Sequence, residues 1–218
     1  MLIQEYLTDY NRENKLFGAQ ADIYLWELTK LSLSFKNIIA IDNLQELDKL
    51  EYLQLDNNII CKISNLEHLT NLKWLDLSFN LIKVIEGLGT LTKLTDLSLY
   101  SNEITELGGL ENLCELNVLS VGKNKLKSFD ASIKYLKPLK NKLEVLKIRD
   151  NDFCEPKEYQ DDVKTYRLMP IALLKNLKYL DYELIESSER TTAEEAYKDE
   201  VNDKGNGADE AAEEVIHQ

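Results

Sequence analysis

Apolar residues recur with a period of 22 residues through the central part of the chain. Leu28, Leu50, Leu72, Leu94 and Leu116 each open a unit with the frame L-x-x-L-x-L-x-x-N-x-I-x-x-I/L-x-x-L-x-x-L-x-x. The alternating L-x-L part is typical of a strand with one buried face, and the later apolar residues come at every third position, as in a tight 3₁₀-like turn. Each unit is therefore predicted to contain one short strand and a compact return segment.

A single unit of this kind cannot bury both of its apolar rows, so the units must stack on one another. The frame identifies a leucine-rich repeat. The predicted fold class is α/β, a right-handed solenoid with a parallel sheet on its concave side, short helical or 3₁₀ turns on its convex side and helical caps at both ends. The strand residues expected to be buried are Leu31/Leu33, Leu53/Leu55, Leu75/Leu77, Leu97/Leu99, Leu119/Val121 and Leu146/Ile148.

Asparagine recurs where each unit turns inward from its strand. A buried amide carries both donors and acceptors and can satisfy backbone groups that a turn leaves unpaired. We interpret this row as a structural ladder without a catalytic or metal-binding role, and the first unit has Lys36 at the same position. The ladder residues are Asn58, Asn80, Asn102, Asn124 and Asn151.

The period is broken once, after the unit that begins at Leu116. The next unit begins at Leu143, 27 residues later, and the additional residues follow Phe129. Insertions in solenoids map to one face, so a longer helix or loop is expected on the convex side. A basic run within this insertion is either a solvated face or a contact site, and it consists of Lys134, Lys137, Lys140 and Lys142.

Four segments are expected along the chain. Residues 1–27 carry apolar residues at helical spacing and are predicted to form an N-terminal helical cap, or alternatively an amphipathic helix that binds a partner. Residues 28–154 hold the repeats. Residues 155–185 are predicted to be a C-terminal cap, with Leu177, Leu180 and Tyr182 forming a last strand-like edge. Residues 186–218 are an acidic tail, either disordered or the start of a helical region.

Composition narrows the classes of function. The net charge of −13 argues against a protein that grips phosphate backbones, and 44% hydrophobic residues are enough to form a core. No segment has the length of uncharged apolar residues that a membrane helix needs. Three widely separated cysteines, Cys61, Cys114 and Cys154, are expected to be reduced thiols of a cytoplasmic protein.

Sequence features of catalysis are missing. The two histidines, His68 and His217, have no cysteine partner nearby, and neither a phosphate-binding glycine loop nor a metal-ligand spacing occurs. We therefore expect no enzyme activity, no cofactor, no metal and no small-molecule substrate.

The side chains that flank the buried leucines of each strand should point away from the core, onto the concave face. Some of these side chains are large aromatics with polar tips, a type enriched at interface hot spots. Three aspartates are expected to form an acidic strip beside them. The last strand carries basic residues, of the opposite charge. Six strands span roughly 25–30 Å, a width that suits a helix or coiled coil of a partner. The alternative is that these aromatics only pack against one another on a solvated sheet. The predicted partner-binding residues are Tyr52, Gln54, Asp56, Trp74, Asp76, Asp96, Ser98, Tyr100, Lys147 and Arg149.

Several blocks point to a narrower family. The blocks LSLSFKNIIAIDNL, LQLDNNII, WLDLSFN followed by IEGL, LTDLSLY and LKYLDY resemble the repeat domain of the dynein regulatory complex subunit 3 family, over roughly residues 25–185. This resemblance implies a scaffold of the ciliary or flagellar axoneme, within the nexin–dynein regulatory complex, with coiled-coil subunits of that complex and neighbouring axonemal proteins as partners. The family continues into a long coiled coil, whereas this sequence ends in an acidic tail.

Other families remain open at this level. The outer-arm dynein light chain with leucine-rich repeats and the repeat-containing regulator of protein phosphatase 1 share the same class of repeat. The closing segment is also similar to the cap of the spliceosomal U2 A-prime protein, which would make the chain a ribonucleoprotein scaffold that binds a protein and not RNA.

Overall fold

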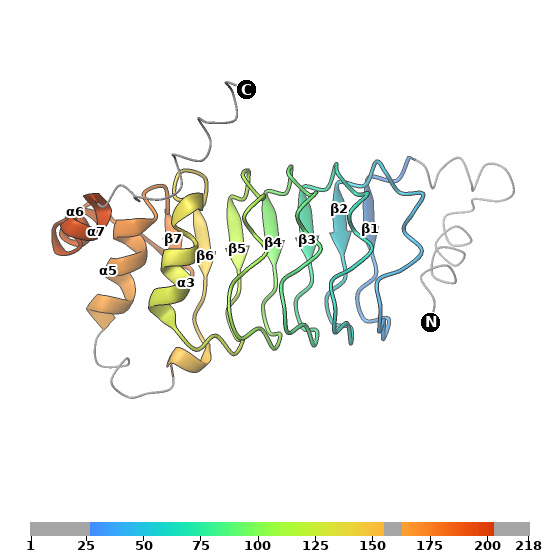
Figure 1. Cartoon of the computed structure of the whole chain (residues 1–218), viewed down its shortest axis with the longest axis horizontal. Coiled ribbons are helices and arrows are strands. Elements are labelled where there is room, and N and C mark those ends of the chain that lie inside the picture. Colours follow the sequence, from blue (N-terminus) through green and yellow to red (C-terminus); the bar gives the residue numbers. More distant parts are fainter. Residues whose placement is uncertain (1–26, 155–162, 203–218) are drawn as a thin grey trace, which may run out of the picture.

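The computed structural model describes residues 27–154 and 163–202 (Figure 1). Eight strands follow one another in one sheet, in the order in which they occur along the chain. The first seven pair in parallel and the last two pair antiparallel. The strands are β1 (Lys30–Ser32), β2 (Tyr52–Gln54), β3 (Trp74–Asp76), β4 (Asp96–Ser98), β5 (Val118–Ser120), β6 (Val145–Lys147), β7 (Tyr179–Leu180) and β8 (Glu183–Leu184).

Each strand pairs with the equivalent residues of the next repeat, which confirms the predicted solenoid. Leu31, Leu53, Leu75, Leu97 and Leu119 lie side by side in this register. They are buried in one continuous core with the apolar rows of the return segments and with the apolar residue that follows each strand: Leu33, Leu55, Leu77, Leu99 and Val121. The core is therefore built by stacking, because no repeat could enclose its own leucines.

The return segments form the compact turns that the three-residue spacing predicts. The N–H of Leu69 donates to the carbonyl of Leu66, and the N–H of Leu72 donates to that of Leu69, at 2.9 Å in both cases. The same bonds recur in the neighbouring repeats. These i→i−3 bonds are those of a 3₁₀ turn, and they place an apolar side chain on the core at every third residue.

The asparagine ladder satisfies backbone groups of two repeats at a time. The amide of Asn80 donates to the carbonyls of Leu55, Leu77 and Ser78 at 3.0–3.1 Å, and its Oδ1 accepts the N–H of Ile60 at 3.0 Å. Asn58, Asn102, Asn124 and Asn151 are buried and make equivalent bonds between their own repeat and the preceding one. Each amide of this row thus satisfies backbone groups at the point where the chain turns inward.

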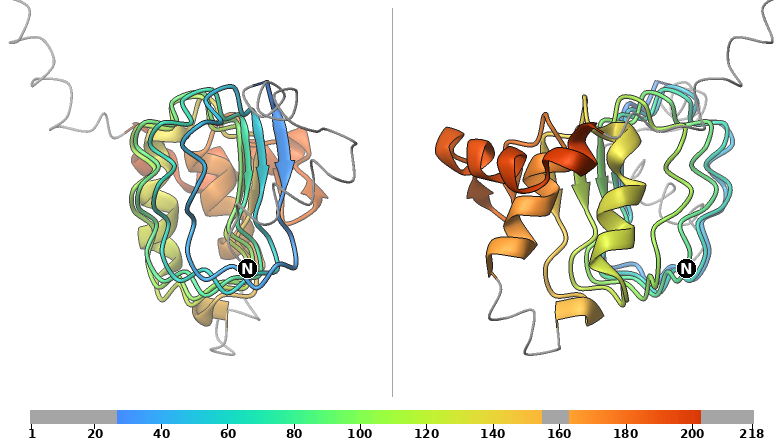
Figure 2. Two further views of the ribbon diagram at one scale, coloured as in Figure 1. Left: turned by 90° about the vertical axis from the view of Figure 1, so that its right-hand side faces the viewer. Right: turned by 60° about the vertical axis from the view of Figure 1, so that its left-hand side comes forward.

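The predicted insertion forms helix α3 (Phe129–Tyr135) and the 3₁₀ turn η1 (Lys137–Leu139). Ser128 caps α3 by accepting the N–H of Ala131, and Phe129 is buried in the core. Figure 2 shows α3 on the opposite side of the solenoid from the strands, on the convex face. Two members of the basic run are engaged: the Nζ of Lys137 donates to the carbonyl of Glu200, and Lys142 pairs with Glu115 at 2.8 Å.

A cluster of helices closes the far end of the solenoid. Beyond η2 (Asp152–Cys154), α5 (Val163–Leu173) packs against α3 and α6 (Ser187–Ala196), and α7 (Lys198–Asn202) follows α6. Figures 1 and 2 show α5 at the end of the row of strands. The core is closed at this end because α5 contributes the buried Met169 and Leu173.

The last strand-like edge differs from the prediction. Strand β7 ends at Leu180, because Asp181 and Tyr182 have φ of 48° and 74° and turn the chain back into the antiparallel β8. Tyr182 is 73% exposed, although the repeat frame places it at a buried position. The side chain of Asp181 accepts the N–H groups of Ile148 and Arg149, directly after β6, where the backbone of a continuing strand would otherwise bond.

The segment from residue 186 is folded as far as residue 202. Arg190 donates to the carbonyls of Ile171 and Leu177, and Ala193 of α6 is fully buried with Ile171 and Ala172 of α5. The folded body therefore continues past the predicted boundary at residue 185. The predicted N-terminal cap, apart from residue 27, and the tail beyond residue 202 lie outside the described residues.

Candidate functional site

The concave face of β1 to β6 carries three parallel rows of side chains, which we call the floor. The strand register places equivalent residues of successive repeats side by side. Backbone hydrogen bonds between repeats continue beyond the ends of the strands and add a third row. No helix of the described chain lies over this face (Figure 2). The first row is Lys30, Tyr52, Trp74, Asp96, Val118 and Val145; the second is Ser32, Gln54, Asp76, Ser98, Ser120 and Lys147; the third is Ser34, Asp56, Ser78, Tyr100, Gly122 and Arg149.

The three predicted aromatics occupy two places on the floor. Tyr52 and Trp74 are register partners in the first row, and Tyr52 is 37% exposed. Tyr100 lies in the third row, across the floor from them. The sequence analysis treated the three aromatics as one group, whereas the strand register places two of them together and the third apart.

Tyr100 belongs to an aromatic contact that the repeat frame did not reveal. Its ring meets the ring of Phe79 edge to face, with centroids 5.6 Å apart, and Phe79 is 45% exposed. Gly122 makes room for the other side of the ring, since a Cβ there would lie 3.2 Å from Tyr100 and 2.9 Å from the carbonyl of Arg149. The signal that the sequence offered was a large aromatic directly before the ladder residue Asn80. In the structure the backbone of Phe79 has a φ of 53°.

The three aspartates lie on a diagonal across the rows, not in a strip along one row. Asp56 is in the third row, Asp76 in the second and Asp96 in the first. Asp56 accepts from the Ser34 hydroxyl and the Asn57 amide, both at 2.5 Å. Within the described part of the chain, none of the three is in a salt bridge.

The surroundings of Asp76 affect the ionisation of its side chain. It accepts the N–H of Ser78 at 2.8 Å. Partial burial nevertheless raises the pKa of its carboxyl above the ordinary value, and the charge of Asp56 acts in the same direction. A cation of a binding partner would relieve both effects.

Two lysines lie near opposite ends of the floor, each over an aromatic ring. The Nζ of Lys30 lies 4.6 Å from the ring centroid of Tyr52, and that of Lys147 lies 4.5 Å from the ring centroid of Tyr182. Arg149 is exposed in the third row, beside Lys147. The basic residues predicted for the last strand therefore lie on the floor. Across the strands, Lys30 comes first, the three aspartates follow, and Lys147 and Arg149 come last.

A hollow of about 440 Å³ opens on the floor between the first three strands. Its walls come from both the first and the second row. Large apolar surface from Tyr52 and Trp74 faces it, with the polar tips of Ser32 and Gln54 alongside, joined by a hydrogen bond of 3.0 Å. The lining residues are Lys30, Leu31, Ser32, Tyr52, Gln54 and Trp74.

Among the described residues, His68 and the three cysteines do not belong to the rows of the floor. The Nε2 of His68 is bonded to the carbonyl of Leu44 at 2.8 Å, on a convex return segment. The three cysteines are free thiols. Among the described residues, no group of histidines, cysteines and carboxylates is arranged to hold a metal ion. In the same part of the chain, no helix combines the length and the apolar character needed to span a membrane.

Comparison with known proteins agrees with this architecture. A family model described as leucine-rich repeats (two copies) matches residues 70–112. No curated protein matches the chain. Among solved structures, it resembles an internalin, InlF, from Listeria monocytogenes, with 24% identity, a TM-score of 0.55 and coverage of 79% of this chain and 47% of that one.

A second similar structure is the functional domain of InlJ from Listeria monocytogenes, with 20% identity and a TM-score of 0.54. The match covers 76% of this chain and 33% of that one, so this chain matches less than half of either structure. At these identities the likeness concerns the fold. The paired register, the asparagine ladder and both comparisons together establish that the chain folds as a leucine-rich-repeat solenoid.

Proposed function

We propose that this chain is a non-catalytic, protein-binding scaffold of the ciliary or flagellar axoneme, a subunit of the nexin–dynein regulatory complex that links doublets and regulates dynein-driven motility. Its partners are coiled-coil subunits of that complex and neighbouring axonemal proteins. Its action is passive recognition and mechanical linkage, without turnover.

The observation that supports a binding role is the uncovered floor. It exposes Tyr52 and Trp74 as neighbours, and it holds three aspartates that form no salt bridge within the described chain. Aromatic side chains with polar tips are the most frequent anchors of protein interfaces. Half-buried carboxylates without a cation are costly to keep unless a partner supplies the opposite charge.

The axonemal assignment is supported by sequence resemblance. The WLDLSFN block at residues 74–80, the register of six repeats and the LDY ending at residues 180–182 resemble the dynein regulatory complex subunit 3 family. In the structure the first of these blocks contains β3, Phe79 and Asn80, and the last contains Asp181. Trp74 of the first block thus belongs to the floor, and Asp181 of the last block lies at the closure of the sheet.

Cross-linking mass spectrometry on intact axonemes that contain this protein tests the assignment. Lysines at both ends of the floor, such as Lys30 and Lys147, serve as handles. Cross-links to coiled-coil subunits of the dynein regulatory complex are expected. Absence from the axoneme, with cross-links to a phosphatase or a splicing protein instead, would show that the family assignment is wrong.

A variant series tests the surface separately. Trp74→Ala and Tyr100→Ala should each weaken recovery of the cross-linked partner by about tenfold or more, since truncation of an interface anchor costs about 2 kcal/mol or more. The matched control is Val84→Ala, a truncation of a 60% exposed apolar residue away from the floor. Unchanged partner affinity in both floor variants would exclude this face as the interface.

A further inference from the structure

The floor carries a spaced series of features that a single helix could contact in order. The hollow lies at β1 to β3, Asp76 and Asp96 lie on β3 and β4, Val118 and Val145 lie on β5 and β6, and Lys147 lies on β6. From β1 to β6 the surface is therefore first apolar, then acidic, then apolar again and finally basic.

The spacing of the strands matches the repeat of an α-helix. Adjacent strands are about 4.8 Å apart, and a helix advances about 5.4 Å per turn. A helix laid across the strands therefore presents about one side chain of the same face to each strand. With a residue i seated over β2, positions of about i+4 and i+7 face β3 and β4, i+11 falls between β5 and β6, and i+14 reaches β6.

We propose that the floor binds one amphipathic helix of a protein partner, whose contacting face reads large apolar, basic, basic, apolar, acidic at about i, i+4, i+7, i+11 and i+14. This inference rests on the proposed binding function and specifies the chemistry of its partner. The large apolar residue at i enters the hollow beside Tyr52 and Trp74.

The acidic part of the series is open to a partner's cations. Asp96 accepts the Thr95 hydroxyl at 2.7 Å, and Asp76 accepts the N–H of Ser78 at 2.8 Å. Neither is in a salt bridge within the described chain, although eight salt bridges involve other carboxylates there. The carboxylate of Asp56 already accepts hydrogen bonds from Ser34 and Asn57. We therefore assign the contacts with the partner's basic residues to Asp76 and Asp96.

The remaining positions follow from the same register. Val118 and Val145 are register partners with partly exposed side chains, which suits a medium-sized apolar residue at i+11. Lys147 lies in the second row of the same strand as Val145, and its Nζ rests on the ring of Tyr182. An acidic residue at i+14 can pair with this ammonium group without displacing a salt bridge recorded for the described residues.

Binding of designed peptides to the full chain tests the series. An alanine-based helical peptide carrying the proposed face is labelled and titrated by fluorescence anisotropy, in both chain directions. A second pair of peptides has glutamate at the two basic positions and is otherwise identical. The basic version, in at least one direction, should bind about tenfold more tightly than its acidic counterpart, because two close charge pairs are exchanged for two repulsions.

The specificity must invert with the floor. In the double variant Asp76→Lys/Asp96→Lys, the acidic peptide should become the tighter ligand. The matched control is Glu46→Lys/Glu106→Lys, which makes the same change of net charge at exposed positions away from the strands and should leave the preference unchanged. Circular dichroism checks that each variant is folded. If the lysine variant does not fold, Asp76→Asn/Asp96→Asn replaces it, and the preference for the basic peptide should then disappear and not invert.

The outcomes separate this inference from the proposed function. Equal affinity of the basic and acidic peptides, or an inversion that also occurs in the Glu46→Lys/Glu106→Lys control, overturns the proposed face. If axonemal cross-links persist in that case, the scaffold function stands and only the chemistry of the partner is wrong. If the peptides behave as expected but no axonemal partner is found, the proposed chemistry of the partner stands and the axonemal function is wrong.

Discussion

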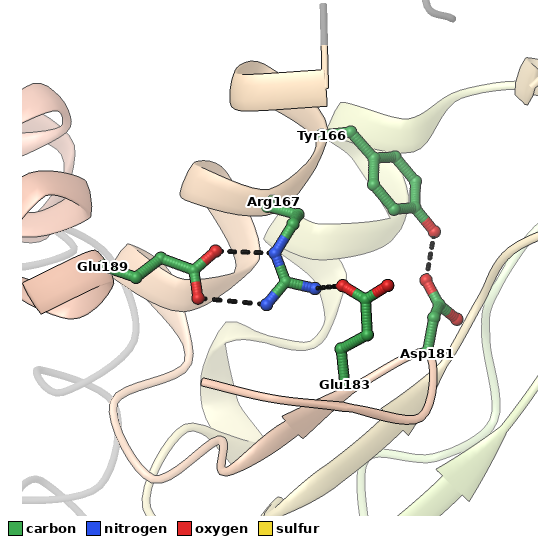
Figure 3. Close-up of polar contacts among 5 residues, drawn as sticks. All are labelled: Tyr166, Arg167, Asp181, Glu183 and Glu189. Carbon is green, nitrogen blue, oxygen red and sulfur yellow. Dashed lines mark hydrogen bonds and ion pairs between the residues drawn. The ribbon is translucent and has the colours of Figure 1, made fainter. Parts of the chain in front are cut away.

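The hydroxyl of Tyr166 donates a hydrogen bond to the carboxylate of Asp181, and this pair closes the last parallel edge of the sheet (Figure 3). The other oxygen of Asp181 accepts the N–H groups of Ile148 and Arg149 at 2.7 and 3.0 Å. The ring of Tyr166 stacks on Phe129 of α3, with centroids 4.8 Å apart. One aspartate therefore takes the place of the next strand's carbonyls, and one tyrosine joins it to the cap.

Removing this closure should destabilise the whole domain. Asp181→Ala leaves two backbone donors unpaired, and we expect a loss of about 2–3 kcal/mol in the free energy of unfolding. Tyr166→Phe keeps the stacked ring and removes one donor, so about 1 kcal/mol is expected. Urea denaturation measures both. Tyr182→Phe, at an exposed ring, is the control and should change little; a comparable loss there would contradict this account.

The docking of α6 depends on Arg167 of α5. Its side chain is 14% exposed, and its Nε and Nη2 donate to the two carboxylate oxygens of Glu189 at 2.6 and 3.0 Å (Figure 3). Arg167→Ala should raise the rate of hydrogen exchange over residues 187–196 by one to two orders of magnitude, since charged hydrogen bonds contribute about 1.5–3 kcal/mol. Lys49→Ala, which removes an exposed pair with Glu27, should leave exchange unchanged.

The same pair gives α6 a pH dependence. Arg167 lowers the pKa of Glu189, chiefly through the hydrogen bond. A carboxyl whose pKa is lower in the folded state stabilises the fold above its unfolded pKa of about 4.3. This stabilisation is lost as the pH falls from there through the folded pKa. Exchange protection of α6 should therefore decline in acid in the wild type, and the decline should be smaller in Glu189→Gln.

Asp76 should show the opposite sign. Burial raises its pKa, so the folded state holds the proton more tightly than the unfolded chain, and stability falls as the pH rises from the ordinary value of 3.8 through the raised pKa. Asp76→Asn keeps an acceptor for Ser78 and removes the charge. Its melting temperature should exceed that of the wild type at pH 7, with the difference vanishing near pH 3. Equal melting temperatures at pH 7 would rule out the desolvation cost.

The asparagine ladder should be energetically expensive to interrupt. Asn80→Ala removes four hydrogen bonds and leaves the buried N–H of Ile60 unpaired. The carbonyls of Leu55 and Leu77 each keep one bond, from Asn58 and Asn102. A loss of at least about 2–3 kcal/mol is expected in urea denaturation. The control is Asn112→Ala, at an exposed asparagine of a return segment, which should change the free energy of unfolding by less than about 0.5 kcal/mol.

The sequence by itself determined the solenoid. A frame that repeats every 22 residues assigns each leucine to a row, because every repeat must place equivalent residues against its neighbours. The buried strand leucines, the asparagine ladder and the convex position of α3 all follow from that frame. So does the membership of Tyr52, Trp74 and Asp76 in the floor, because alternate residues of a strand point to opposite faces.

Only the tertiary structure decided which side chains meet. The aspartates fall on a diagonal because their positions within the strands differ by two residues from one repeat to the next, and a one-dimensional frame does not show distances across a sheet. The contacts of Phe79 with Tyr100, of Tyr166 with Asp181 and of Arg167 with Glu189 join residues 15 to 22 positions apart. These contacts depend on where helices and turns pack. At the end of the solenoid the 22-residue period stops, so no repeat predicts how the helices pack there.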